Sequence, residues 1–255
     1  MTAPALQAVI LAAGKGTRMK SGRAKVLHPV LGVPLLEHVV RTVQATGASP
    51  ITVVVGHQAD AVEKAFAGRG LQFVRQDPPR GTGHAVQVAR ALFAAHPERT
   101  LLVVNGDVPL LRTETLQALL SAHGQGRPAA TLLTVVLDEP GAYGRVVRDE
   151  GGGVRAIVEA KDATPTERAV REVNAGLYVF DVPALLGVLD RLQPQNAQGE
   201  YYLTDVVGLL RAEGRAAGAM AADDPAEGLG VNSLAELAAA TLTLRGRRAE
   251  ALMAA

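Results

Sequence analysis

The chain has 255 residues, of which 48% are hydrophobic and 3% aromatic, so it can build one large domain with an aliphatic core. Its 26 basic and 25 acidic residues give a net charge of +1, which argues against a nucleic-acid or membrane surface. It has no cysteine, which excludes disulfides and thiolate chemistry. It has no 18-residue apolar run, and no charged region precedes its short N-terminal apolar strand, so we expect neither a membrane span nor a signal peptide. We therefore expect a cytoplasmic protein that contacts neither nucleic acid nor membrane.

Strand-like and helix-like segments alternate through the first half of the chain. This alternation indicates βαβ units, and hence a Rossmann-like α/β fold whose mostly parallel sheet is flanked by helices on both faces. In such sheets, ligands bind beyond the carboxyl ends of the strands. The predicted strands are 8–13, 51–55, 71–74 and 100–105, and the predicted helices are 34–44, 59–67, 84–95 and 113–123.

The pattern changes after a further predicted strand at 129–137. Two short strands flank a glycine-rich turn at 149–153, which is typical of a hairpin. We therefore expect a smaller β-rich lobe over about 138–180. The remaining predictions are strands at 143–148, 154–159, 172–180 and 216–221 and helices at 182–192, 202–213 and 233–253.

The most informative motif directly follows the first predicted strand. Gly14 and Gly16 allow a sharp turn that brings backbone N–H groups close to a ligand. Thr17, Arg18 and Lys25 add a hydroxyl and two positive charges, a combination that suits a polyphosphate. The spacing matches neither a Walker loop nor a dinucleotide fingerprint. The alternative is an ordinary turn between strand and helix with exposed charges.

A second motif follows the strand at 100–105. Asp107 comes just past this buried strand, where a carboxylate can hold Mg²⁺ together with substrate phosphates and water. The alternative is a turn aspartate that precedes Pro109. The six histidines are scattered without metal-ligand spacing, so we expect them to be structural or exposed.

Two further groups of polar residues are candidates for ligand recognition. The amide of Gln76 can donate and accept toward a base edge, and Gly81 allows close backbone approach. Thr82 is a candidate cap for the helix expected from about residue 84. Glu159, Asn174 and the polar run 196–205 suit the hydroxyl and amide groups of a sugar, although each taken singly is better explained as a surface or capping residue.

Short motifs spread over nearly the whole chain give it a resemblance to a known family. They lie at 11–19, 25–28, 81–85, 106–110, 143–145, 157–163, 174–176, 196–205 and 230–232. With these motifs in this order, the chain resembles the sugar nucleotidyltransferases, in particular the bacterial N-acetylglucosamine-1-phosphate uridylyltransferases. The first motif is shared by many sugar-nucleotide enzymes, whereas 157–163 and 196–205 are more specific.

The resemblance implies roles for individual residues. Lys25 would contact phosphate, Arg18 would steady the triphosphate, and Asp107 and Asn232 would hold Mg²⁺. The implied nucleotide-binding residues are Leu11, Ala12, Ala13, Gly14, Gly16, Thr17, Gln76, Gly81 and Thr82. The implied sugar-binding residues are Asn105, Gly144, Glu159, Asn174, Tyr202 and Thr204. The family often has an aromatic residue at position 105, so no stacking role is expected there.

The resemblance also implies a reaction. UMP would pass from UTP to N-acetylglucosamine 1-phosphate, giving pyrophosphate and UDP-N-acetylglucosamine for cell-wall precursor synthesis. The sugar phosphate is already anionic and needs no general base, so catalysis would rest on positioning and on charge neutralisation by Mg²⁺, Arg18 and Lys25. The alternatives are a related nucleotidyltransferase for another sugar phosphate or base, and a non-catalytic nucleotide-sugar sensor.

One part of the family pattern is absent from the sequence. The family usually continues into a left-handed β-helix of hexapeptide repeats, which acetylates glucosamine 1-phosphate and holds a trimer together. This chain contains no such repeat, so we expect no acetyl transfer, and the oligomeric state stays open. The expected organisation is a nucleotidyltransferase domain over 1–232, which includes the β-rich lobe, and a linking helix over 233–255.

Overall fold

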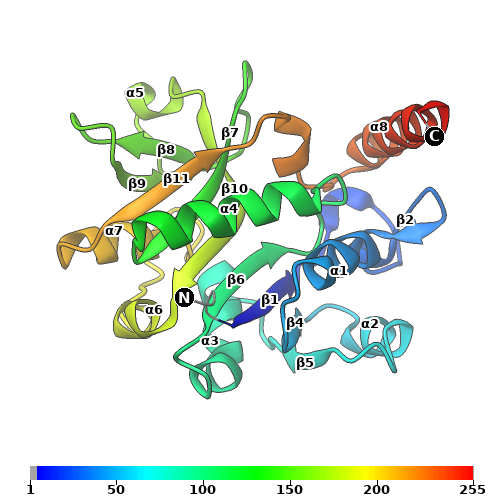
Figure 1. Ribbon diagram of the computed structural model, residues 1–255, viewed down its shortest axis with the longest axis horizontal. Helices are drawn as coiled ribbons and strands as arrows, with labels where there is room; N and C mark the ends of the chain where they lie inside the picture. Colours follow the sequence, from blue (N-terminus) through cyan, green and yellow to red (C-terminus); the bar gives the residue numbers. More distant parts are fainter. Residues whose placement is uncertain (1–4, 255) are drawn as a thin grey trace.

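The computed structural model describes residues 5–254, and nine strands of this part of the chain form one sheet (Figure 1). Its order is β11–β7–β10–β6–β1–β4–β5, and a hairpin of β8 and β9 attaches to β10. The strands are β1 (Leu6–Ala12), β4 (Ile51–Val55), β5 (Gln72–Arg75), β6 (Thr100–Asn105), β7 (Ala130–Val136), β8 (Arg145–Arg148), β9 (Val154–Val158), β10 (Glu172–Asp181) and β11 (Ala217–Ala221).

Along the seven-strand path of this sheet, four of the six pairings are parallel. β1 lies between β4 and β6 and runs parallel to both, β4 is parallel to β5, and β7 is parallel to β11. β10 runs antiparallel to its neighbours β6 and β7. The central strands are apolar on both faces, as a sheet covered by helices on both sides requires. The predicted α/β fold with a mostly parallel sheet is confirmed.

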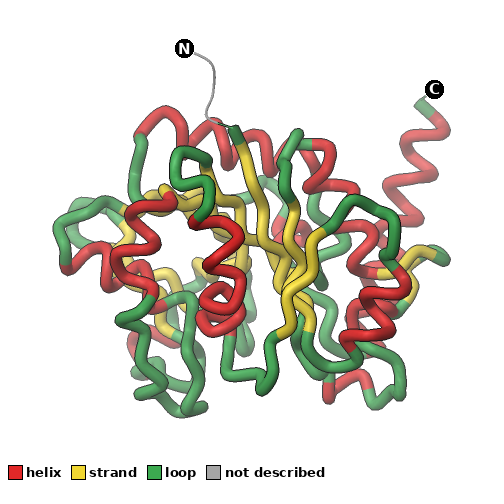
Figure 2. The backbone as a smooth tube through the Cα atoms, turned by 90° about the horizontal axis from the view of Figure 1, so that it is seen from below, coloured by secondary structure: helices red, strands yellow, loops and turns green. Residues whose placement is uncertain are grey.

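Helices cover both faces of the sheet, because successive side chains of a strand point to opposite sides (Figure 2). Val9 packs in the core beneath α3, α6 and α7, whereas its neighbour Ile10 packs in the core beneath α1, α2 and α4. The helices are α1 (Leu35–Ala45), α2 (Ala59–Ala65), α3 (Thr82–Ala94), α4 (Thr113–Gly126), α6 (Val182–Leu189) and α7 (Asp205–Ala212).

The predicted β-rich lobe contains strands that are continuous with the main sheet. Arg145 of β8 pairs with Val173 of β10, and β10 itself lies in the centre of the sheet between β6 and β7. The β8–β9 hairpin and the short helix α5 (Pro165–Arg168) extend beyond it (Figure 1). Thr164 and Glu167 form a reciprocal capping box that fixes the start of α5.

Two helix starts differ from the sequence prediction, and both lie at the candidate site. α3 begins at Thr82, with Gly81 as its N-cap, so the prediction that Thr82 caps this helix is wrong. The hydroxyl of Thr82 instead accepts a hydrogen bond from the backbone N–H of Leu203 at 3.0 Å. α7 begins later than predicted, so Tyr202 and Thr204 lie in the preceding loop rather than in the helix.

Several short elements escaped the sequence prediction because they are too short to show a period. They include a hairpin of β2 (Pro29–Val30) and β3 (Val33–Pro34) and three turns of 3₁₀ helix, η1 (Thr17–Met19), η2 (Lys25–Leu27) and η3 (Pro225–Gly228). Two of these turns carry candidate site residues, which places those residues on ordered backbone.

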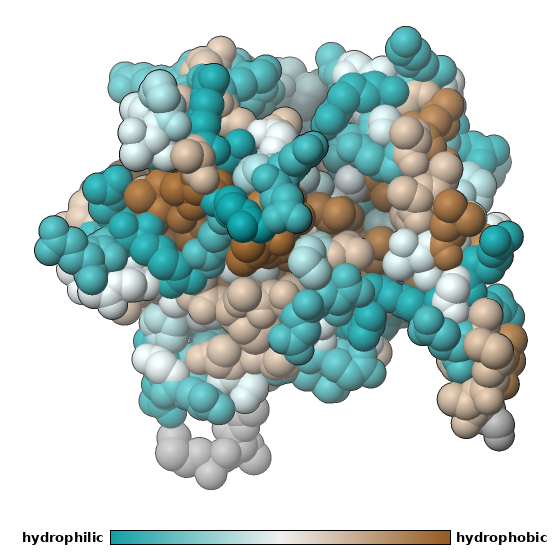
Figure 3. All heavy atoms as spheres, turned by 90° about the horizontal axis from the view of Figure 1, so that it is seen from above, coloured by the Kyte–Doolittle hydropathy of each residue, from teal (hydrophilic) through white to brown (hydrophobic). Residues whose placement is uncertain are grey.

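The last helix, α8 (Leu234–Met253), extends away from the sheet (Figures 1 and 2). Ser233 caps it by accepting a hydrogen bond from the N–H of Glu236, which confirms the predicted start. Leu242 and Leu252 are more than half exposed, and Figure 3 shows hydrophobic residues along this projecting segment. Within residues 5–254, no helix is long and apolar enough to cross a membrane.

Candidate functional site

A two-part cleft opens beyond the carboxyl ends of β1 and β6, the edge at which parallel sheets bind ligands. The first cavity has a volume of about 480 Å³ and the second about 210 Å³. Leu11, Thr82, Asn105 and Asp107 line both cavities, so the two parts meet along these residues.

Most predicted site residues line this cleft. Besides the four shared residues, the first cavity is lined by Ala12, Ala13, Gly14, Lys25, Gln76 and Gly81. The second is lined by Gly144, Glu159, Asn174, Thr204 and Asn232. The remaining predicted site residues line neither cavity; they are Gly16, Thr17, Arg18 and Tyr202.

The glycine loop after β1 brings Lys25 into the cleft. Gly16 has φ +61°, and a Cβ there would lie 2.6 Å from Cβ of Lys25, so only glycine lets the two segments pack this closely. Arg18 follows on η1 as an exposed residue at the edge of the loop. Gly16 thus has a packing function, whereas the sequence prediction had assigned it to ligand contact.

Three side chains from distant parts of the chain converge where the cavities meet. The ammonium of Lys25 forms an ion pair with the carboxylate of Asp107 and donates a hydrogen bond to Oδ1 of Asn232 at 3.0 Å. Lys25 and Asp107 are each only 13% exposed. A positive group therefore already stands between the two oxygens that were predicted to hold Mg²⁺.

This oxygen pair fits a divalent cation that shares its ligands with a substrate. Mg²⁺ in phosphoryl-transfer sites takes one or two carboxylates and completes its shell with phosphate oxygens and water. Residues 5–254 contain no group of three or more His, Asp or Glu side chains that could enclose a metal by themselves. A cation at Asp107 and Asn232 therefore needs oxygens from a ligand.

The predicted nucleotide-binding residues near Gly81 contact one another and the loop before α7. The side-chain amide of Gln76 donates to the carbonyl oxygen of Gly81 at 2.9 Å. A Cβ on Gly81 or Gly83 would lie 2.6 or 2.9 Å from the carbonyl oxygen of Tyr201. Both glycines are thus required by chain packing. Glu200 of the same loop, which belongs to the polar run 196–205 predicted for sugar recognition, lines the first cavity.

The second cavity contains the half-buried carboxyl group of Glu159. Oε1 of Glu159 accepts a hydrogen bond from the hydroxyl of Thr204 at 3.1 Å. Burial raises the pKa of Glu159 above its usual value, and the hydrogen bond from Thr204 only partly offsets this. Gly144 packs against the same carboxyl, because a Cβ there would lie 3.4 Å from Oε1.

An irregularity in β10 directs Asn174 toward the second cavity. The register between β10 and β7 shifts between Asn174 and Tyr178, which is the signature of a bulge. The side chain of Asn174 accepts from the N–H of Gly176 at 3.1 Å and donates to the hydroxyl of Tyr178 at 2.6 Å. Gly176, at φ +74°, leaves room for the amide of Asn105.

Two tyrosines near the second cavity relate differently to the prediction. Tyr143, which was not predicted as a site residue, lines the cavity, and its hydroxyl accepts from the N–H of Gly230 at 3.2 Å. Burial raises the pKa of Tyr143. The sequence signal for it was the motif at 143–145, in which only the adjacent Gly144 was assigned to the site. The hydroxyl of Tyr202 accepts from the amide of Gln198 at 2.8 Å, and its contact with a sugar stays a prediction.

Comparison with known sequences identifies relatives over almost the whole chain. The bifunctional protein GlmU of Brevibacillus brevis is 48% identical over 242 residues, which cover 95% of this chain and 52% of that protein. The bifunctional protein GlmU of Anaeromyxobacter dehalogenans is 49% identical over 255 residues, which cover 98% and 51%. The chain thus spans about half the length of these curated relatives.

Solved structures with lower identity share the fold. A putative glucose-1-phosphate thymidylyltransferase from Bacillus anthracis superposes with a TM-score of 0.73 at 19% identity and covers 94% of this chain and 96% of its own. A UDP-glucose pyrophosphorylase complexed with UDP-glucose superposes with a TM-score of 0.74 at 18% identity and covers 95% and 99%.

The model of one protein family matches the part of the chain that carries most of the cleft. The match covers residues 8–174, from the first strand through the bulge of β10. It includes the glycine loop, Lys25, Asp107 and Glu159. On this match, the chain belongs to the family of MobA-like NTP transferase domains.

Proposed function

We propose that the protein is a uridylyltransferase that joins UTP and N-acetylglucosamine 1-phosphate to give UDP-N-acetylglucosamine and pyrophosphate. The observation that carries the proposal is the position of Asp107, which lines both cavities and is linked to Asn232 through the ammonium of Lys25. A transferase with two anionic substrates needs such a junction, because both phosphates must reach the same cationic group. The relatives at 48–49% identity support this choice of substrates.

The larger, first cavity would take the nucleotide. The backbone of residues 11–14 would approach the uridine part, together with Gln76, Gly81 and Thr82, and Lys25 would bind phosphate at the inner end. Arg18 lies exposed at the edge of the loop, where it would steady the outer phosphates of UTP. Thr17 and Gly16 would act through the shape of the loop.

The smaller, second cavity would take the sugar. Glu159 and Thr204 would pair with sugar hydroxyls, and Asn174 with the N-acetyl group, while Gly144 leaves space beside them. Asn105 lies between the cavities and would contact whichever substrate reaches the junction. The half-buried carboxyl of Glu159 would bind a ligand that carries hydroxyl groups, because without one it lacks enough hydrogen-bond donors.

The chemistry follows from the charges of the substrates. A phosphate oxygen of the sugar phosphate attacks the α-phosphorus of UTP, and the bond from that phosphorus to the bridging oxygen of the β-phosphate breaks. Pyrophosphate leaves with the bonding electron pair, so no proton transfer to a protein base is needed. The chain contributes alignment of the two substrates and the positive charge of Lys25 and Arg18.

The same junction would hold the divalent cation that nucleotidyltransferases of this kind use, and we propose Mg²⁺. Asp107 and Asn232 would supply its protein oxygens, with phosphate and water as the remaining ligands. When bound, the cation would neutralise charge on the phosphates and polarise the α-phosphoryl group. We propose a cytoplasmic location, where UTP is available, and a role in peptidoglycan and lipopolysaccharide precursor synthesis.

The test is pyrophosphate release from UTP and Mg²⁺ with each of three sugar phosphates. We expect release with N-acetylglucosamine 1-phosphate and much less with glucose 1-phosphate or glucosamine 1-phosphate. Preference for another sugar would keep the mechanism and overturn the substrate. Binding of UDP-sugar by a folded protein without release would favour the sensor alternative.

The cation assignment has its own test in Asp107→Asn. The substitution keeps the shape of the side chain and removes its charge, so we expect at least about a 10²-fold loss of turnover. Circular dichroism should show an unchanged fold. Full Mg²⁺-dependent activity in this variant would refute the cation site.

A further inference from the structure

The segment 224–232, which we call the Asn232 arm, connects β11 to α8 and carries η3. It packs tightly on the sheet, because a Cβ on Gly228 would lie 2.7 Å from Val135 and 2.8 Å from Ala175. Glu227 of this arm is only 3% exposed, although it is a carboxylate. Burial of a charged group is costly unless it is well paired, so the contacts of Glu227 need a reason.

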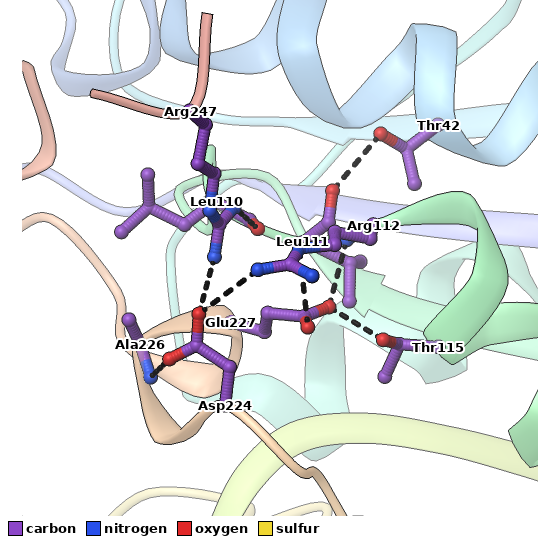
Figure 4. Close-up of polar contacts among 9 residues, drawn as sticks. All are labelled: Thr42, Leu110, Leu111, Arg112, Thr115, Asp224, Ala226, Glu227 and Arg247. Carbon is purple, nitrogen blue, oxygen red and sulfur yellow. Dashed lines mark hydrogen bonds and ion pairs between the residues drawn. The ribbon is translucent and has the colours of Figure 1, made fainter. Parts of the chain in front are cut away.

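Glu227 reaches across to the first turn of α4 (Figure 4). Its Oε2 accepts hydrogen bonds from the backbone N–H of Arg112 at 3.0 Å and from the hydroxyl of Thr115 at 2.6 Å, and its Oε1 lies 3.5 Å from Nε of Arg112. Arg112 is the N-cap residue of α4 but makes no side-chain cap. Glu227 therefore caps α4 from a segment 115 residues away in sequence, where the helix dipole favours a negative charge.

A second set of contacts reinforces the first. Asp224 lies 3.2 Å from Nη2 of Arg112 and 2.7 Å from Nη2 of Arg247 of α8, and Arg247 also donates to the carbonyl oxygen of Leu110 at 2.6 Å (Figure 4). At the other end of the arm, the N–H of Val231 donates to the carbonyl oxygen of Asp107 at 2.8 Å.

These contacts fix two segments side by side. One runs from Asp107 to the start of α4, and the other is the Asn232 arm. Asp107 and Asn232 are therefore held at one end of a pair of segments that Glu227 fastens at the other end. Within residues 5–254, the arm has no strand pairing, so its place beside Asp107 depends on side-chain contacts and on single backbone bonds such as that from Val231.

We propose that Glu227 is a positioning residue for the reaction: by capping α4 from the arm, it holds the amide oxygen of Asn232 beside the carboxylate of Asp107 and so sets the affinity for the divalent cation. This inference rests on the proposed function, since it takes the cation site at Asp107 and Asn232 as given. Residues that orient metal ligands without touching the metal change metal affinity by about 10- to 100-fold when they are replaced.

The principal test is the variant Glu227→Ala. Electron paramagnetic resonance measures its binding of Mn²⁺ in the presence of UTP, and rates of pyrophosphate release at varied Mg²⁺ measure its Mg²⁺ dependence. We expect the Mn²⁺ dissociation constant and the half-saturating Mg²⁺ concentration to rise about tenfold or more. The KM for UTP at saturating Mg²⁺ should change less. Glu227→Gln keeps an oxygen acceptor for Arg112 and Thr115, so it should restore cation affinity to within about threefold of the original.

A matched control separates positioning from general loss of stability. Glu37 is a buried carboxylate of α1, 5% exposed, that is paired with Arg41 and Arg69 rather than with the Asn232 arm. Glu37→Ala should lower the unfolding midpoint and leave the Mn²⁺ dissociation constant unchanged. An equal rise in that constant for Glu37→Ala and Glu227→Ala would overturn the proposal.

A milder variant covers the case in which Glu227→Ala does not fold. Thr115→Val removes one hydroxyl that donates to Glu227 but keeps the shape of the side chain at position 115. We therefore expect a rise of about two- to threefold in the Mn²⁺ dissociation constant. A folded Glu227→Ala, or failing that Thr115→Val, with unchanged cation affinity would overturn the inference.

Asp107→Asn distinguishes this failure from failure of the proposed function. If Asp107→Asn loses Mn²⁺ and Glu227→Ala does not, the cation site stands and the positioning role fails. If Asp107→Asn binds Mn²⁺ as the original protein does, the cation site itself is wrong.

Discussion

Small residues, among them Ala12, Ala13, Gly14 and Gly81, line much of the first cavity of the cleft, whereas the half-buried polar side chains of Glu159 and Asn174 line the second. The shape of the first cavity therefore depends on how closely the chain can pass. The second depends on polar groups that are partly removed from water. We therefore expect variants in the first cavity to act through its shape and charge, and variants in the second to act through hydrogen bonding and titration.

The largest effect is expected at the junction of the two cavities. Lys25→Ala removes the ammonium that contacts Asp107 and Asn232 and that would bind phosphate, so we expect about a 10²-fold loss of kcat/KM for UTP. Initial rates at varied UTP measure it. The KM for the sugar phosphate should rise less than that for UTP, and unchanged kinetics would remove Lys25 from the mechanism.

The next effect isolates the second cavity. Glu159→Gln keeps the size of the side chain but removes a buried acceptor charge, so we expect about a tenfold rise in KM for the sugar phosphate. The KM for UTP should stay within about twofold, because Glu159 does not line the first cavity. Equal rises in both KM values would show that the two cavities do not act separately.

The same variant has an opposite and pH-dependent effect on stability. Burial raises the pKa of Glu159, so the folded state holds its proton more firmly than the unfolded state does. The free energy of unfolding then falls as pH rises from the unfolded pKa through the folded one. Glu159→Gln removes this term, so it should be more stable than the original protein at neutral pH, and the difference should shrink toward pH 4.5, the usual pKa of this group. Denaturant titrations at several pH values measure it, and a variant that is less stable at neutral pH would contradict the prediction.

The smallest effects on activity come from two glycines, one in each cavity. Gly81 has φ +100°, and a Cβ there would meet the backbone oxygen of Tyr201, whereas a Cβ at Gly176 would meet the movable amide of Asn105. We expect Gly81→Ala to lower the free energy of unfolding by about 2–3 kcal/mol and Gly176→Ala by about 1–2 kcal/mol. Chemical denaturation measures both. Gly81→Ala should mainly raise the KM for UTP and Gly176→Ala that for the sugar phosphate, and the reverse order would contradict the division of the cleft.

Much of the fold and of the cleft could be predicted from the sequence. The apolar runs at 8–13 and 100–105 gave the positions of β1 and β6, and parallel strands end at the same edge, so the glycine loop and Asp107 had to lie near each other. The predicted start of α3 was wrong. Threonine is a residue type that often caps helices, but the hydroxyl of Thr82 accepts a hydrogen bond from Leu203 instead. No local pattern could reveal that partner, which lies 121 residues away.

Local periodicity and the backbone freedom of particular residues are enough to predict the main strands and helices along the chain, the glycine loop and the set of charged groups. They do not predict that Lys25 lies between Asp107 and Asn232, 82 and 207 residues away, or that Glu227 caps α4. Contacts of this kind depend on how separately formed elements pack, since the free energy of a buried ion pair or hydrogen bond is set by distance and burial rather than by spacing along the chain.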